Sequence, residues 1–537
     1  MKKGQTISAV VLNVHFPNRG VCRIIETPNA EDVIEELPKI RVKNVIPGQK
    51  VSVRVARLRH GKPEGSCLEI LERAEGEYPA EDKEHVCPSF PACGGCAYQT
   101  LPYEKQLVLK EDMARDLFLP VLGEERYNSI WEGFVESPVK SEYRNKMEFT
   151  FGDSVKDGPL ELGMHRRGSF YDIVDASVCR IVDEDFLQAV TITRDYFREA
   201  GLPFFRRNSH EGYLRHLLVR KARKTGQILI DLVTTRQIGE QLPEIEGLTI
   251  DSYTEIQKNT DEDRLLAAWT ERLKAASWKG QLCGVLHTKN DAIADIIRDD
   301  GTDILFGSPI FEEELLGLKF NISPFSFFQT NSLGAEKLYS VARDYILGKD
   351  SACAEEEENR SSADVSQSSL AGKTVFDLYS GTGTIAQILS PSCGHVVGVE
   401  IVAEAVEAAK ENAKKNQITN CDFLCGDVLK VLDDIRDRPD MIVLDPPRDG
   451  IHPKAMPKLL AYGVDEMLYI SCKPTSLARD LPAMMEAGYE PVRMTCVDMF
   501  VSTPNFETVV LLNNKFSKAK DFVQIGIDAA DYYRIKG

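Results

Sequence analysis

The sequence lacks both the long apolar segments of a membrane protein and the leader of an exported one. No apolar run approaches the ~18 residues needed to span a bilayer. The N-terminal residues 1–16 contain neither the apolar core nor the cleavage site of a signal peptide. We therefore expect a cytoplasmic protein without a membrane partner. Disulfides are rare in the cytosol, so the 13 cysteines are expected to include metal ligands, a catalytic thiol and buried structural thiols.

The chain also lacks a net positive charge. Its formal net charge of −18 at pH 7 argues against nonspecific binding to nucleic acid, because phosphate contacts need clustered Lys and Arg. Basic residues nevertheless crowd two stretches, 38–62 and 206–226, while acidic residues gather elsewhere, as in 354–360. A charged run is in general a solvated surface. Basic stretches on an otherwise acidic chain make them candidates for phosphate contacts.

The chain shows no repeat of fixed period, and its 537 residues predict two to four domains at roughly 100–200 residues per domain. Residues 1–74 alternate apolar and polar residues between Gly and Pro turns, which is typical of a small antiparallel β-barrel. Residues 75–325 start with a stretch rich in Pro, Gly and Cys and then mix strands with helices, which predicts an α+β region. Residues 349–372 are acidic, Ser-rich and low in complexity, which predicts a disordered insertion. Residues 515–537 are a C-terminal tail without an assigned role.

Residues 326–514 have a different character. From residue 373 onward, short apolar strands alternate with helical segments, which predicts a doubly wound and mostly parallel sheet. The predicted fold class is therefore α/β, with a Rossmann-like C-terminal domain that follows a small β-barrel and a central α+β domain.

A glycine-containing turn follows the first strand of this sheet, in VFDLYSGTGTIAQIL at residues 375–389. Gly381 and Gly383 would let a ligand approach backbone that a Cβ would block, although a tight turn between strand and helix would explain them as well. The next strand ends at Glu400, where a carboxylate can accept hydrogen bonds from ribose hydroxyls, and Asp427 follows near a predicted adenine. The turn lacks the third glycine of a dinucleotide fingerprint, which favours S-adenosyl-L-methionine over NAD.

Three further polar residues are expected at the same edge of the sheet. Asp445 and Cys472 directly follow apolar strands, and Glu507 begins the last strand. Ligands of open α/β sheets bind beyond the carboxyl ends of the strands. If the last strand runs antiparallel, its start lies at that edge too. Taken singly, each residue has an ordinary explanation as a strand-end acid, a core thiol or an edge acid.

Four motifs of the chain resemble, in order and spacing, those of RNA (uracil-5)-methyltransferases. They are FDLYSGTGTI, VLDPPRDGIHPK, YISCKPTSLARDL and DMFVSTPNFETV. The nearest resemblance is to the iron–sulfur enzymes that methylate 23S ribosomal RNA. It implies a class I methyltransferase domain at 326–514, an RNA-binding TRAM domain at 1–74 and an iron–sulfur central domain. It also implies methylation of a uridine in 23S rRNA by a monomeric enzyme. The alternatives are methylation of uridine 54 in tRNA and a non-catalytic RNA-binding assembly factor.

The resemblance assigns the catalytic roles. Uracil C5 is a poor nucleophile until a thiolate adds to C6, so the reaction needs a nucleophilic cysteine and a base. Cys472 is expected to be the nucleophile and Glu507 the base. The chain departs from the family beside both residues. Lys473 stands where Asn is usual, and Val501, Ser502 and Asn505 replace a Pro and two His.

The resemblance also implies that Gln329, Tyr379, Glu400 and Asp445 hold the methyl donor. Asp445 has an alternative role in polarising the uracil. Phe325, Phe327 and Phe328 precede Gln329, and either stacking on an extruded base or packing in the core would explain them.

Four cysteines form a candidate metal site. Cys87, Cys93 and Cys96 have the spacing C-x5-C-x2-C in a loop poor in apolar residues, and Cys179 follows at a distance. Four thiolates suit either zinc or an iron–sulfur cluster, and spacing alone does not choose between them. The resemblance favours [4Fe–4S]. The remaining cysteines that we expect to be structural are Cys22, Cys67, Cys283, Cys393, Cys421, Cys425 and Cys496.

Overall fold

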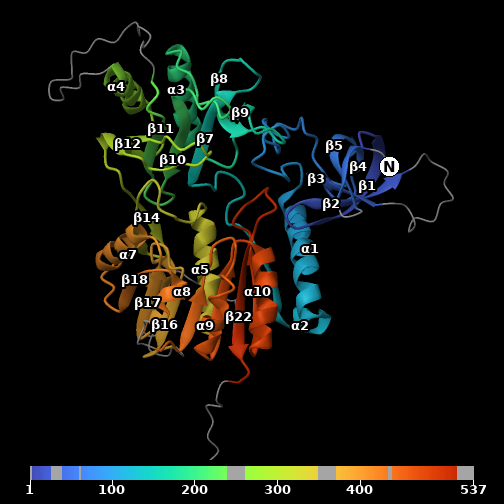
Figure 1. Cartoon of the computed structure of the whole chain (residues 1–537), viewed down its shortest axis with the longest axis vertical. Coiled ribbons are helices and arrows are strands. Elements are labelled where there is room, and N and C mark those ends of the chain that lie inside the picture. Colours follow the sequence, from blue (N-terminus) through green and yellow to red (C-terminus); the bar gives the residue numbers. More distant parts are fainter. Residues whose placement is uncertain are drawn as a thin grey trace, which may run out of the picture.

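A computed structural model describes residues 3–25, 39–59, 62–238, 261–348, 370–432 and 438–516 of the chain. The predicted insertion lies outside these residues except for positions 370–372, and the tail does so from residue 517. In the described part, the strands form a closed five-stranded barrel, a seven-stranded sheet, a two-stranded hairpin and an eight-stranded sheet (Figure 1). No helix among these residues combines the length and apolarity needed to cross a membrane.

The N-terminal strands close into the predicted small barrel. They are β1 (Thr6–His15), β2 (Arg19–Ile25), β3 (Lys39–Lys43), β4 (Lys50–Arg59) and β5 (Lys62–Glu72). The strand order is β1-β2-β3-β5-β4, and the pairing is antiparallel except between β3 and β5. Alternate residues point inward, as the buried Ile40 and Val42 of β3 illustrate. This alternation is the pattern from which the barrel was predicted.

The central part is a mixed sheet in the order β13-β12-β11-β10-β7-β8-β9. Its strands are β7 (Lys146–Asp153), β8 (Leu160–His165), β9 (Ile173–Asp175), β10 (Leu214–Lys221), β11 (Gln227–Thr234), β12 (Gln281–Lys289) and β13 (Thr302–Gly307). Helices α3 (Glu184–Glu199) and α4 (Asp261–Ala275) pack on it through a core that includes Phe186, Phe197 and Trp269. The hairpin of β14 (Phe311–Leu315) and β15 (Leu318–Ile322) leads to the C-terminal part.

The C-terminal sheet has the order β18-β17-β16-β19-β20-β22-β21-β6. Its strands are β6 (Trp131–Val135), β16 (Thr374–Leu378), β17 (His395–Glu400), β18 (Cys421–Cys425), β19 (Met441–Leu444), β20 (Glu466–Ser471), β21 (Tyr489–Val497) and β22 (Glu507–Asn514). Its helices are α5 (Ser332–Ile346), α6 (Thr384–Leu389), α7 (Ala403–Lys415), α8 (Val428–Val431), α9 (Met456–Ala461) and α10 (Pro474–Glu486), with a 3₁₀ turn, η3, at Ser390–Ser392. Strands β16 to β20 run parallel, as predicted.

This sheet is buried on both faces, which explains why its strands are almost continuously apolar. Adjacent residues of β16 illustrate the arrangement. Val375 belongs to the core shared with α5, α6 and α7, whereas Phe376 belongs to the core shared with α1 (Tyr103–Leu122) and α10.

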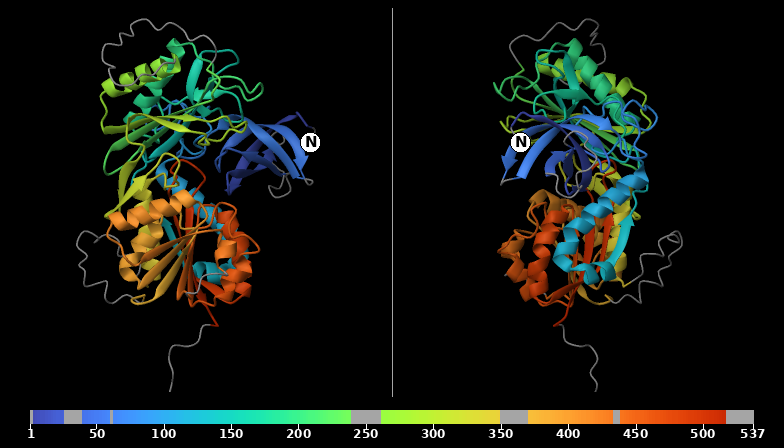
Figure 2. Two further views of the ribbon diagram at one scale, coloured as in Figure 1. Left: turned by 60° about the vertical axis from the view of Figure 1, so that its left-hand side comes forward. Right: turned by 90° about the vertical axis from the view of Figure 1, so that its right-hand side faces the viewer.

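The segment from residue 103 to residue 135 packs differently from the sequence prediction, which placed it in the central region at 75–325. Helices α1 and α2 (Glu124–Ile130) lie against the C-terminal part, as Figure 2 shows in light blue, and β6 pairs with β21 at the edge of the C-terminal sheet. The apolar stripe of α1, which includes Met113 and Phe118, is visible in the sequence. Its partner surface on α10 lies far away in the chain, so the periodicity of α1 cannot identify it.

A buried ion pair fixes α1 to the loop that precedes β22. Lys110 Nζ lies 2.7 Å from Asp498 Oδ1, and both side chains are inaccessible to solvent. The same ammonium donates a hydrogen bond to the carbonyl of Phe500 at 3.0 Å. Burial lowers the pKa of Lys110, and the Asp498 carboxylate opposes this shift. Because an isolated buried charge is costly, α1 and this loop are held in one arrangement.

Candidate functional site

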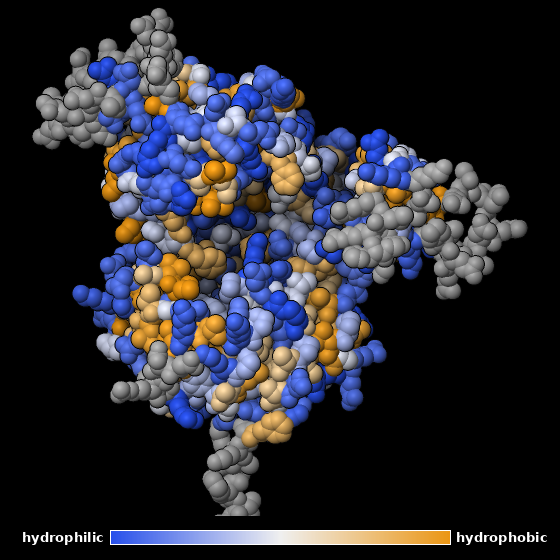
Figure 3. Space-filling view, viewed as in Figure 1, coloured by the Kyte–Doolittle hydropathy of each residue, from blue (hydrophilic) through white to orange (hydrophobic). Residues whose placement is uncertain are grey.

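The carboxyl ends of the parallel strands face the central part of the molecule. In Figure 1 the arrow of β22 points away from that part, because β22 runs opposite to the parallel strands, including its neighbour β20. Figure 3 shows a hollow between the central part above and the C-terminal part below. The predicted site residues at the strand ends therefore face a recess between two domains, which is a common location for ligand sites.

Cys472 and Glu507 lie side by side at this edge. Strand β22 is antiparallel to β20, and Ser471 is paired with Thr508. Cys472 follows Ser471 at the end of β20 and Glu507 precedes Thr508 at the start of β22, so both residues lie at this edge, and the charge of Glu507 acts on the Cys472 thiol. The condition on which the sequence argument depended, an antiparallel last strand, is confirmed.

The environment of Glu507 favours its protonated form. The side chain is 1% exposed, and its Oε2 has no hydrogen-bond partner among the described residues. Burial, and then the nearby Asp445, raise the pKa of Glu507 to about 8, while the Arg448 guanidinium opposes the shift. A carboxyl that titrates near neutral pH is suited to accept a proton during a reaction.

Cys472 is half-buried and shares the same surroundings. Burial raises its pKa to about 11, and the charges of Glu507 and Asp445 add to this shift. Arg448 opposes it. Arg448 is thus a cation that favours the ionised forms of both Cys472 and Glu507. The turn that carries it is tied to α10, because Ser476 Oγ donates a hydrogen bond to the Arg448 carbonyl at 2.6 Å.

Buried carboxyls cluster around Asp445. Burial raises the pKa of Asp445 to about 7. Asp377, inside β16, also has its pKa raised to about 7 by burial, and Asp445 and Glu400 add to the shift. Asp377 accepts a hydrogen bond from the backbone N–H of Ala386 at 3.0 Å, which links it to the start of α6. Such a cluster attracts a cation, because a nearby positive charge stabilises the ionised carboxylates.

The glycine turn lies next to this cluster. Gly381 has φ +54°, and a Cβ built there would meet nothing within 4 Å, so packing does not explain the glycine. Its N–H donates to Glu400 Oε2 at 3.0 Å, which brings turn and carboxylate together. Gly383 differs, since a Cβ there would lie 2.5 Å from the Phe423 ring. Gly383 therefore has a packing role that the sequence did not reveal.

Two other predicted residues lie near the turn. Tyr379 is half-buried with φ +68°, and burial followed by the charge of Asp427 raises its pKa to about 12. Asp427 is thus within electrostatic range of Tyr379. Its side chain also accepts a hydrogen bond from the Leu429 N–H at 3.0 Å, which caps α8. Asp427 consequently has a structural task in addition to any contact with a ligand.

Gln329 is connected to the site by Tyr339, a residue that the sequence analysis did not identify. Gln329 is 7% exposed and hydrogen-bonds to Tyr339 on α5. Burial raises the pKa of Tyr339 well above its usual value, and the charges of Asp445 and Glu507 add to this shift. Tyr339 lies on the buried face of α5 and looks like a core residue in the sequence. Arg448, also missed as a site residue, stands three positions after Asp445, in the DPPR motif.

The three phenylalanines before Gln329 differ in how far their side chains are buried. Phe328 is 6% exposed and packs in the core against Phe320. Phe327 is 67% exposed, and Phe325 is half-buried. Phe327 is therefore the one with a free ring face for a ligand.

The four candidate metal ligands line one cavity of about 190 Å³. Cys87, Cys93, Cys96 and Cys179 all border it. Cys93 Sγ accepts a hydrogen bond from the Gly95 N–H, and Cys96 Sγ accepts one from Gln99 Nε2, each at 3.4 Å. Within the residues that the structure describes, no three or more His, Cys, Asp or Glu side chains form a group that could hold a metal ion.

The cysteine loop contacts the segment that leads to Glu507. The N–H groups of Ala97 and Tyr98 donate to the Ser502 carbonyl at 2.8 and 3.0 Å. The Ser502 N–H in turn donates to Gln106 Oε1 on α1 at 2.8 Å. The cysteine loop, distant in sequence from Glu507, therefore contacts the segment that leads to it through Ser502.

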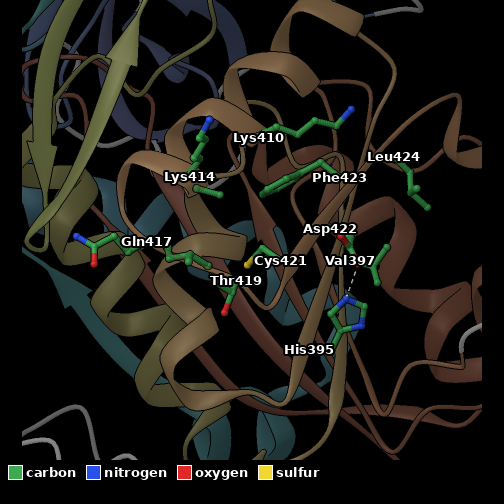
Figure 4. A pocket seen from close by; sticks show the side chains of 12 residues that line it. His395, Val397, Lys410, Lys414, Gln417, Thr419, Cys421, Asp422, Phe423 and Leu424 are labelled. Carbon is green, nitrogen blue, oxygen red and sulfur yellow. Dashed lines mark hydrogen bonds and ion pairs between the residues drawn. The ribbon is translucent and has the colours of Figure 1, made fainter.

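A further groove of about 520 Å³ follows the edge strand β18 and α7, bordered by Lys410, Lys414 and Asp422 (Figure 4). It contains none of the predicted site residues, and three strands separate β18 from β20 in the sheet.

Known proteins are similar to the chain over nearly its whole length. An RNA methyltransferase of Clostridium tetani, described as uncharacterized, is 42% identical over 525 residues, which cover 96% of this chain and 99% of that one. A second one, from Clostridium acetobutylicum, is 43% identical over 515 residues with the same coverage. The model of a family described as methyltransferase domain matches residues 369–517.

A solved structure shares the overall fold. It is the tRNA (uracil-54, C5)-methyltransferase of Pyrococcus abyssi in complex with S-adenosyl-L-homocysteine. The TM-score is 0.64 at 21% sequence identity, with coverage of 94% of this chain and 100% of that one. At this identity the likeness shows the fold alone.

The electrostatic coupling around Cys472 predicts how its thiol reacts. Glu507→Gln removes a negative charge that raises the Cys472 pKa, so alkylation by iodoacetamide at about pH 9 should become roughly three- to tenfold faster. Arg448→Gln should slow it by a similar factor. Mass spectrometry of the Cys472 peptide measures the rate, and exposed Cys425 in the same protein is the internal reference. Equal rates in all three proteins would show that these charges do not act on the thiol.

Proposed function

The chain belongs to the RNA methyltransferases, and from this premise we propose that it methylates C5 of a uridine through a covalent bond between Cys472 and uridine C6. The observation that carries the proposal is that Cys472 and Glu507 flank the pair Ser471–Thr508 at the edge of β20 and β22, where the charge of Glu507 acts on the Cys472 thiol. A thiol and a proton-accepting carboxyl close together are the two groups that this reaction requires. All the groups come from a single chain, so a monomer suffices.

S-adenosyl-L-methionine is the proposed methyl donor, and the carboxyl cluster supports it. Burial raises the pKa values of Asp377 and Asp445 to about 7 and that of Glu507 to about 8, and the charge of Asp445 adds to the shifts of the other two, so the recess favours a cationic ligand. The donor carries a sulfonium and an ammonium group and, when bound, supplies an electrophilic methyl group. We propose that Gly381 and Glu400 contact its ribose, Tyr379 and Asp427 its adenine, and Gln329 and Asp445 its amino-acid end.

The chemistry of the chain's own residues follows from their placement. The Cys472 thiolate forms a bond to uridine C6, which moves electron density to O4 and makes C5 nucleophilic. After C5 has gained the methyl group, Glu507 removes the C5 proton. The electron pair of that C–H bond restores the C5–C6 double bond and expels the Cys472 thiolate. Arg448 assists both groups, because its charge lowers the pKa of Cys472 and of Glu507.

The proposed RNA target is 23S ribosomal RNA. The N-terminal barrel, as a TRAM domain, and the cysteine-lined cavity support this choice, since both are features of the family that the motifs resemble. The fold shared with the Pyrococcus abyssi enzyme supports the alternative, uridine 54 of tRNA.

A [4Fe–4S] cluster is the proposed occupant of the cysteine cavity. Such a cluster binds one thiolate on each of four irons, so its ligands stand around a larger object than a single zinc ion. The proposal rests on four thiols that line one cavity of about 190 Å³, two of which accept N–H hydrogen bonds; among the described residues they do not stand close enough together to form a metal-binding group, so the loop would have to close on the cluster. When bound, the cluster would cross-link the loop of Cys87, Cys93 and Cys96 to Cys179, and so hold the loop that contacts Ser502.

Two substitutions separate the nucleophile from the base. Cys472→Ala should abolish methyl transfer and the covalent complex with RNA that contains 5-fluorouridine. Glu507→Gln should reduce turnover by about 10²- to 10⁴-fold and accumulate a covalent complex with ordinary RNA, because adduct formation precedes proton removal. Denaturing gels with labelled RNA measure the complexes.

Cys425→Ala is the matched control, since this thiol is exposed and outside the site. A fully active Cys472→Ala variant would refute the covalent mechanism. A wild-type protein that binds RNA but forms no covalent complex with any RNA would favour the non-catalytic RNA-binding assembly factor.

The RNA target is tested by mapping 5-methyluridine in a deletion strain. We expect loss from 23S rRNA and retention in tRNA, measured by mass spectrometry of nuclease digests of the separated RNAs. Restoration by the wild-type gene, but not by the Cys472→Ala gene, controls for indirect effects. Loss from tRNA alone would assign the enzyme to the alternative target.

The metal site is tested by composition. Protein purified without oxygen should contain about four irons and four sulfides per chain with brown absorbance, and Cys179→Ser should lose most of both. The control is Cys283→Ser, which should retain both. Cys283 does not line this cavity, and its thiol donates a hydrogen bond to the Ile228 carbonyl at a distance of 3.0 Å. Stoichiometric zinc without iron would contradict the proposal.

A further inference from the structure

A basic groove of about 510 Å³ lies between the barrel and the central part. Its basic side chains come from both: Arg19 and Lys43 from the barrel, and Arg166 and Arg167 from the loop after β8. No Asp or Glu is among the described residues that line it, and beside it Asp172 Oδ2 lies 3.7 Å from Arg166 Nε. On a chain with a net charge of −18, this concentration of positive charge selects a polyanion.

The loop between β8 and β9 adds exposed aromatic side chains beside the groove. Phe170 is 75% exposed and Tyr171 is 58% exposed, and both follow Gly168, the last groove residue of this loop. The loop is held by local hydrogen bonds, since Ser169 Oγ accepts from the N–H groups of Tyr171 and Asp172, both at 3.2 Å. An ordered loop with two exposed rings next to basic residues is the arrangement on which unpaired bases stack.

The groove also contains a buried acceptor. Asn18 is 6% exposed and donates through Nδ2 to Asn44 Oδ1 at 2.8 Å, which connects two turns of the barrel. Its Oδ1 has no hydrogen-bond partner among the described residues. A buried amide oxygen without a partner is costly, and a ribose 2′-hydroxyl can donate the missing hydrogen bond.

We propose that this groove and the β8–β9 loop bind an unpaired segment of the RNA substrate, apart from the uridine that is methylated. Arg19, Lys43 and Arg166 contact phosphates, Phe170 and Tyr171 stack on bases, and Asn18 accepts from a ribose. The proposal rests on the RNA methyltransferase family of the chain and is independent of which base or atom is methylated.

One loop connects the groove with the segment that leads to the candidate active site. Gly95 borders both the groove and the cysteine cavity. Two residues further along the same loop, the N–H of Ala97 donates to Ser502, which leads to Glu507. The loop that borders the groove therefore also contacts the segment before Glu507, and we propose that a flanking RNA segment and the target uridine belong to one molecule.

Binding of a fluorescein-labelled oligouridine of about 16 nucleotides, followed by fluorescence anisotropy with the full-length protein, tests the proposal. Phe170→Ala should weaken binding roughly tenfold. Arg19→Gln combined with Lys43→Gln should lower the slope of log K against log salt by about 1.4, which corresponds to two phosphate contacts on a single strand. These side chains are exposed, so thermal melting should be unchanged.

Matched control variants come from the rest of the surface. Lys410→Gln combined with Lys414→Gln removes the same charge from the groove along β18, and Phe516→Ala removes another exposed ring. Both should bind like wild type. If the groove variants also bind like wild type, the proposal is overturned and the exposed rings belong to a protein contact instead.

Two further arms test the chemistry of recognition. A fully paired RNA duplex should be insensitive to Phe170→Ala, and equal sensitivity would overturn the stacking role. Oligodeoxyuridine should bind more weakly than oligouridine, and equal affinity would overturn the ribose contact of Asn18. Binding needs no methyl transfer, so failure of the Cys472 mechanism would leave these measurements unaffected.

Discussion

The antiparallel insertion of β22 between β20 and β21 is the constraint on which the candidate site depends. A strand that ran parallel would place Glu507 at the opposite edge of the sheet, away from Cys472. The pairing of Ser471 with Thr508 instead places a thiol close to a carboxyl. A shift of one residue in this register would turn one of the two side chains to the other face. The burial of neighbouring β22 residues depends on the same register, since Val509 and Leu512 pack in two different cores.

The loop before β22 is held as firmly as the strand itself. Lys110 and Asp498 form an ion pair without access to solvent, and Gln106 and the cysteine loop hold Ser502 by its backbone. Ser502 stands where the resembled family has a different residue, but its backbone N–H and carbonyl make three of its contacts, and its side chain adds a longer one, from Gln106 Nε2 to Ser502 Oγ at 3.4 Å. This explains how the segment can depart from the family motif while Glu507 keeps its place.

Burial of several carboxyls in one recess gives the site its chemical character. Water would stabilise these charges, and the recess removes it, so their pKa values rise toward neutrality. Arg448 moderates the effect at Glu507 and Cys472. A recess of this kind is poised for a cationic ligand, and the basic groove beside the barrel is suited to an anionic polymer. The two charge preferences match the two substrates of an RNA methyltransferase.

The sequence by itself determined the local elements. The barrel strands, the alternation of strands and helices after residue 373, the glycine turn and the positions of Asp445 and Cys472 at strand ends all depend on patterns within a few neighbouring residues. Tertiary structure alone decided which surfaces meet. It placed α1 and β6 on the C-terminal part, brought Tyr339 and Arg448 into the site, gathered Cys179 with three cysteines of a distant loop, and connected that loop to Ser502. Such contacts join residues tens to hundreds of positions apart, and they are selected by the packing of complementary surfaces, which no periodicity within one segment encodes.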